Sequence, residues 1–78
     1  MRIGDFQRVL TDTNQLIQMY PDLAEAYYMR ASGYEGLGQR TQAMADLEKC
    51  GELAQAQGND TLYAQSRVRL ATLMQAGP

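Results

Sequence analysis

The sequence predicts an all-α protein of about four antiparallel helices, and three observations support this fold class. Apolar side chains recur at helical spacing through four stretches of the chain. Ala and Gln are abundant, and both favour helices. Proline occurs only at positions 21 and 78, so little interrupts these stretches. Seventy-eight residues then form one small domain, whose stability is marginal.

The first predicted helix spans residues 5–19. Its apolar side chains form a wide stripe on one face, and they are Phe6, Val9, Leu10, Leu16, Ile17 and Tyr20. Asp5 follows Gly4 and suits the N-cap position, because its carboxylate can accept hydrogen bonds from free backbone N–H groups. Pro21 ends the helix, since the residue before a proline avoids helical backbone angles.

Residues 22–54 predict two helices that form an antiparallel hairpin. Asp22 and Glu25 have the spacing of a capping box at the start of the first helix, which runs to Leu37. A break at residues 38–40 precedes the second helix, 41–54. Each helix buries one face, made of Leu23, Tyr27, Ala31, Tyr34 and Leu37 in the first and of Ala43, Leu47, Cys50 and Ala54 in the second.

Gly33 and Gly36 lie inside the predicted helix 22–37. Each costs about 1 kcal/mol relative to Ala in a helix interior. They are either tolerated surface glycines or points at which another backbone approaches closely, and the sequence leaves both interpretations open.

A fourth helix is predicted over residues 61–75. Gly58 can adopt a positive φ that stops the preceding helix, and Asp60 or Thr61 can cap the new one. The apolar face should close the core, and it carries Leu62, Tyr63, Leu70, Leu73 and Met74. The outer face is polar, with Gln65, Arg67, Arg69 and Gln75, and Gly77 and Pro78 end the helix.

The hairpin resembles a tetratricopeptide repeat, whose pattern is W-x2-L-G-x2-Y, then A-x3-F, then P. The corresponding residues are Tyr27-x2-Arg30-Ala31-x2-Tyr34 and Ala43-x3-Leu47. Arg30 departs from the apolar residue of the pattern, and Gln55 stands where the closing proline would be. The resemblance implies an α-solenoid built from helical hairpins.

The repeat period of 34 residues also aligns the start of the chain with the hairpin. It places Val9 on Ala43 and Thr13 on Leu47, with Pro21 in the closing position. The predicted organisation is a single domain, 1–78, that is a segment of a longer protein. It consists of a half-repeat (4–21), a full repeat (22–56) and a capping helix (60–76). The last helix is predicted to be a cap and not a further repeat, because aligning Tyr63 with Tyr27 places Arg67 where the repeat pattern needs a small residue.

The residue types argue against catalysis. The chain has no His, the commonest general base and metal ligand, and a lone Cys50 has no activating partner. No zinc-ligand cluster or calcium loop occurs, and the glycines at 33, 36 and 38 do not follow a strand as a phosphate-binding loop would. We therefore expect no enzyme activity, cofactor or metal.

Charge and hydropathy limit the classes of partner that the sequence predicts. A net charge of −2 argues against nucleic-acid binding, although Arg67 and Arg69 form a small basic spot without nearby acids. No apolar run is long enough to span a membrane, and no targeting signal occurs in this segment. A cytoplasmic location is favoured, but the sequence does not identify the compartment.

The resemblance implies a protein–protein interaction module that binds a peptide or a partner helix. In tetratricopeptide repeats the first helix of each hairpin lines a concave groove. On helix 22–37 the candidate groove residues are Glu25, Tyr28, Met29, Ser32 and Glu35. They lack the Lys, Arg and Asn with which some family members clamp a C-terminal carboxylate. The alternative is that they face solvent or are covered by a neighbouring repeat.

Two other functions stay open. The resemblance implies that helix 5–19 is the second helix of a repeat whose first helix is absent from this segment. Its wide apolar stripe then favours self-assembly into a homodimer or higher oligomer that buries Phe6 and Leu10. The segment can also be a regulatory domain of a larger enzyme, which only the longer protein can decide.

Overall fold

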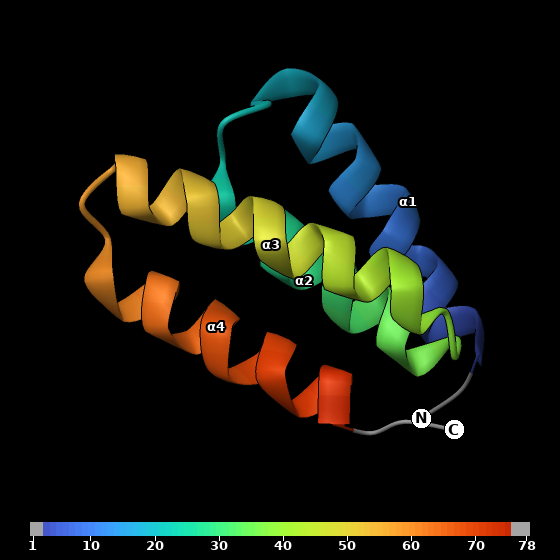
Figure 1. Cartoon of the computed structure of the whole chain (residues 1–78). Helices are drawn as coiled ribbons and strands as arrows, with labels where there is room; N and C mark the ends of the chain where they lie inside the picture. Colours follow the sequence, from blue (N-terminus) through green and yellow to red (C-terminus); the bar gives the residue numbers. More distant parts are fainter. Residues whose placement is uncertain (1–2, 76–78) are drawn as a thin grey trace.

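The structure is a computed structural model that describes residues 3–75. It contains four helices and, within those residues, no strand: α1 (Ile3–Met19), α2 (Ala24–Gly36), α3 (Arg40–Ala56) and α4 (Asp60–Gln75). Successive helices reverse direction, with α2 and α3 in the middle and α1 and α4 on opposite flanks (Figure 1). The predicted all-α fold of helical hairpins is confirmed. None of these helices is both long and apolar enough to cross a membrane.

The turns that follow α2 and α3 share one design. Gly38 and Gly58 have φ of 75° and 74°, a backbone conformation that costs energy for residues with a side chain. In each turn the N–H of the residue after the glycine donates to the carbonyl oxygen five residues earlier, at 2.8 Å. This is the Schellman arrangement, which satisfies free carbonyl groups at a helix end. The prediction that Gly58 stops a helix by a positive φ is confirmed.

The predicted N-caps of α1 and α2 are wrong. The first helix begins at Ile3, so Asp5 lies inside its first turn, where a negative charge still favours the positive helix end. Leu23 precedes α2 and makes no side-chain capping bond. Asp22 is one residue further away, and its backbone carbonyl instead accepts a hydrogen bond of 2.6 Å from the side chain of Gln57.

The N-terminus of α4 is capped by Asn59, not by Asp60 or Thr61. The Asn59 side-chain oxygen accepts a hydrogen bond of 3.1 Å from the backbone N–H of Leu62. Since α4 begins at Asp60, both predicted candidates lie within its first turn. The predicted helix end at residues 77–78 lies outside the described part of the chain.

The core lies between α2, α3 and α4. One buried cluster consists of Ala24, Tyr27, Cys50, Ala54 and Leu62, and the other of Ala31, Ala43, Leu47 and Leu70. The predicted packing faces of α2 and α3 therefore meet, and α4 closes the core as expected. Met74 is an exception to the predicted apolar face of α4, because it is 63% exposed.

The glycines of α2 make room for α1. A methyl group added at Gly36 would overlap the ring of Phe6, and one at Gly33 would lie 3.0 Å from Cδ2 of Leu10. Gly33 and Gly36 therefore permit a close approach, although side chains of α1, rather than its backbone, fill the space. Phe6 and Leu10 are half-buried in these contacts.

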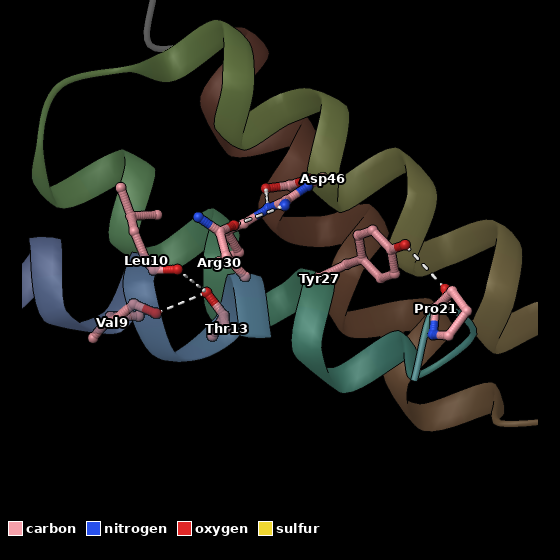
Figure 2. A network of polar contacts seen from close by, with 8 residues as sticks. Val9, Leu10, Thr13, Pro21, Tyr27, Arg30 and Asp46 are labelled. Carbon is pink, nitrogen blue, oxygen red and sulfur yellow. Dashed lines mark hydrogen bonds and ion pairs between the residues drawn. The ribbon is translucent and has the colours of Figure 1, made fainter. Parts of the chain in front are cut away.

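A buried polar residue occupies the centre of the face that α1 turns to α2. Thr13 is fully buried, and its hydroxyl donates to the carbonyl oxygen of Val9 at 2.7 Å (Figure 2). The sequence period aligns Thr13 with the apolar Leu47. Because the bond lies within its own helix, Thr13 can take an apolar position without an unsatisfied hydroxyl.

Arg30 joins three helices. Its Nε and Nη2 donate to the two carboxylate oxygens of the buried Asp46 on α3, at 2.9 and 2.8 Å, and its Nη1 donates to Asn14 on α1 at 3.0 Å. The guanidinium lies 5.6 Å from the ring centre of Tyr27, a residue that Figure 2 also shows, and 5.8 Å from that of Tyr34. Both distances are within cation–π range. The bond to Asp46 raises the pKa of Arg30. This network explains how a charged residue fits the apolar position of the repeat pattern.

Candidate binding groove

An open groove of about 600 Å³ runs between α2 and α4. The residues that line it are Tyr28 and Glu35 from α2 and Ala64, Gln65, Val68, Arg69 and Thr72 from α4. We call this feature the α2–α4 groove.

The α4 side of the groove carries an apolar ridge. Ala64, Val68 and Thr72 follow each other at four-residue spacing, so they lie on one face of the helix. Val68 is 67% exposed, and no described core cluster includes it. This wall therefore presents an unburied apolar side chain.

The α2 side supplies Tyr28, which is half-buried and packs against both core clusters. It anchors the groove to the core, and the groove is consequently held by the same packing that holds the fold.

An ion pair bridges the two walls. Nε of Arg69 lies 2.8 Å from Oε2 of Glu35, and this bond raises the pKa of Arg69. The Arg69 side chain is 45% exposed, whereas that of Glu35 is 20% exposed. The Arg69 side chain is thus the more accessible partner.

The predicted site residues divide into two groups. Tyr28 and Glu35 line the groove, whereas Glu25, Met29 and Ser32 are not among its lining residues. Glu25 and Met29 are exposed, and Ser32 is half-buried with its hydroxyl donating to the carbonyl oxygen of Tyr28 at 3.4 Å. The structure holds no partner, so it leaves the binding role of all five as a prediction.

Sequence reasoning missed the α4 contribution. Val68 offered one signal, since it is apolar but lies outside the predicted apolar face of its helix. Arg69 belongs to the predicted polar outer face of its helix, and nothing in the helical spacing indicates that it forms an ion pair with Glu35 on another helix.

Other hollows and reactive groups differ from this groove. A hollow of about 530 Å³ lies at the turn between α1 and α2 and is lined by Met19, Tyr20, Pro21, Asp22 and Leu23. Cys50 is buried, and desolvation raises the pKa of its thiol, which disfavours the reactive thiolate. Within residues 3–75, no three His, Cys, Asp or Glu side chains are grouped so that they could hold a metal ion.

No protein-family model matches the chain, and no solved structure matches it significantly. The tetratricopeptide resemblance stays a prediction based on residues 4 to about 53.

Proposed function

We propose that this protein is a non-catalytic protein-interaction module, a tetratricopeptide-like scaffold that binds a peptide or a partner helix in the α2–α4 groove. The observation that carries the proposal is the exposed Val68 in a groove whose other wall is the core-anchored Tyr28. A preformed hollow with an aromatic wall and a few polar groups is typical of binding sites.

The energetics favour this use of the groove. Tyr28 is held by the core, so binding costs little ordering of this side chain. Covering an exposed valine contributes about 1.5 kcal/mol to binding, which corresponds to roughly a tenfold gain in affinity.

The test is selection of short random peptides, displayed on phage, against the immobilised protein. We expect the selected peptides to bind about tenfold more weakly to Val68→Gln. Met74→Gln is the matched control, because Met74 is also an exposed apolar residue of α4, at 63%, but does not line the groove. Tyr28→Ala is less informative, since Tyr28 also packs against the core.

Two results would contradict the proposal. One is the absence of selected peptides, and the other is peptides that lose equal affinity with Val68→Gln and Met74→Gln, which would place binding elsewhere.

Self-assembly is the second candidate function, and the surface of α1 supports it. Five side chains of its apolar stripe are only half-buried, and Tyr20 is exposed, as is the neighbouring Met19. A second copy can cover this surface, in keeping with the predicted homodimer.

A further inference from the structure

We infer that the α2–α4 groove selects partner segments in which an Asp or Glu lies beside an apolar side chain, with the carboxylate bound by Arg69. The inference rests on the proposed function and specifies its ligand. The apolar side chain would pack against Val68 and Tyr28, and the carboxylate would meet the terminal nitrogens of Arg69.

The first step is the geometry of the ion pair. Glu35 engages Nε of Arg69, at 2.8 Å. The hydrogen bond of this pair uses one of the five N–H donors of the guanidinium, and a side-chain hydrogen bond to Tyr28 also helps to raise the pKa of Arg69. A guanidinium binds a carboxylate with two N–H groups at once, and the terminal nitrogens retain such donors.

The second step is accessibility. The Arg69 side chain is 45% exposed and the Glu35 side chain 20% exposed, so the Arg69 side chain is the more accessible of the two to an incoming segment. Glu35 fixes the guanidinium in place, which lowers the entropy cost of binding a second carboxylate. The pair therefore presents hydrogen-bond donors, although its two charges cancel formally.

The third step is the neighbouring surface. Val68 precedes Arg69 directly, and Ala64 lies one helical turn before Val68. An exposed apolar ridge thus lies beside an exposed guanidinium, which is complementary to an apolar residue next to an acid. Arg69 is the only basic residue among those lining the groove, and Glu35 already balances it, so a singly charged carboxylate fits better than a phosphate dianion.

The test uses the displayed random peptides and their binding to variants of the full chain. We expect the selected peptides to be enriched in Asp or Glu next to an apolar residue. Arg69→Gln should weaken them about tenfold or more, because hydrogen bonds to charged groups contribute more than neutral ones. Arg67→Gln is the matched control, because Arg67 is a nearby arginine of α4 that does not line the groove. Higher salt should weaken binding to the unmodified protein.

A second variant keeps the test independent of any loss of stability in Arg69→Gln. Glu35→Gln removes the negative charge beside Arg69, while the amide oxygen of Gln can still accept the Nε–H bond that fixes the guanidinium. Acidic peptides should therefore bind more tightly to this variant. Circular dichroism melts establish that each variant is folded.

The outcomes separate this inference from the proposed function. Peptides that depend on Val68 but contain no acids, and that bind Arg69→Gln as well as the unmodified protein, would overturn the carboxylate inference alone. Equal losses with Arg67→Gln and Arg69→Gln would also overturn it, since they would indicate general charge attraction. If no peptide depends on Val68, or if only a second copy of this chain binds, the proposed function fails and the inference fails with it.

Discussion

Ala31 controls how closely α2 and α3 approach. It is 1% exposed and belongs to a core cluster with Ala43 and Leu47, whereas the neighbouring Ser32 is half-buried and bonded within its own helix. Ala31→Leu should therefore lower the free energy of unfolding by about 1–3 kcal/mol through overpacking. Ser32→Leu should cost less. Thermal melts of both variants measure the difference, and equal shifts in Tm would contradict the observed rotation of α2.

Arg30 illustrates what a single sequence indicates about a residue and what it does not. The pattern marks Arg30 as a charged residue at an apolar position. Its partner Asp46 is 16 residues away on another helix and is itself 5% exposed. Helical periodicity gives the face on which a residue lies, but not the relative shift of two helices along their axes. The bidentate pair depends on that shift, so only the structure reveals it.

At the scale of the helix, Gly36 tests the contact between α1 and α2. Replacing Gly by Ala normally stabilises a helix by about 1 kcal/mol. Here the added methyl overlaps the ring of Phe6, so Gly36→Ala should instead destabilise the protein by about 1–3 kcal/mol. Urea unfolding measures the sign. Gly4→Ala is the control, because Gly4 also lies in a helix but a methyl group there meets no atom within 4 Å, so this change should not destabilise the protein.

A further variant separates overlap from other causes. If Phe6 is the obstacle, Gly36→Ala should cost much less in a Phe6→Ala background, in which the ring is absent. An equal cost in both backgrounds would mean that the glycine is needed for another reason.

The helices were easier to predict than their ends. Periodicity spans many residues and tolerates single departures, so all four helices and the core faces of α2 and α3 follow from the sequence. An N-cap depends on one residue, and in the run Asn59-Asp60-Thr61 all three can serve. Gly58 was predictable because few residues adopt a positive φ. On the α2 side of the groove, Tyr28 and Glu35 were among the residues that the resemblance suggested. The α4 side could not be predicted, because it depends on how α4 packs beside α2.

At the scale of the whole molecule, α1 is the least covered element. It packs mainly against α2, and α4 lies on the opposite flank, so no described helix covers the outer side of α1 (Figure 1). Phe6 and Leu10 pack next to Gly36 and Gly33 of α2, but each side chain is still only half-buried. The exposed side chains of Met19 and Tyr20 lie at the end of this helix, at 65% and 55%.

Burying a large apolar side chain contributes about 1.5–3 kcal/mol, so a second copy that covers α1 would stabilise this small domain appreciably. Two-fold symmetry would let both copies gain at once. We therefore expect light scattering after size exclusion to give a mass that rises toward that of a dimer as concentration increases. Changing both Met19 and Tyr20 to Gln should shift this equilibrium toward the monomer, whereas Met74→Gln on α4 should not. A protein that stays monomeric at high concentration would rule out the homodimer, and the half-exposed stripe of α1 would then be a surface that this small domain tolerates.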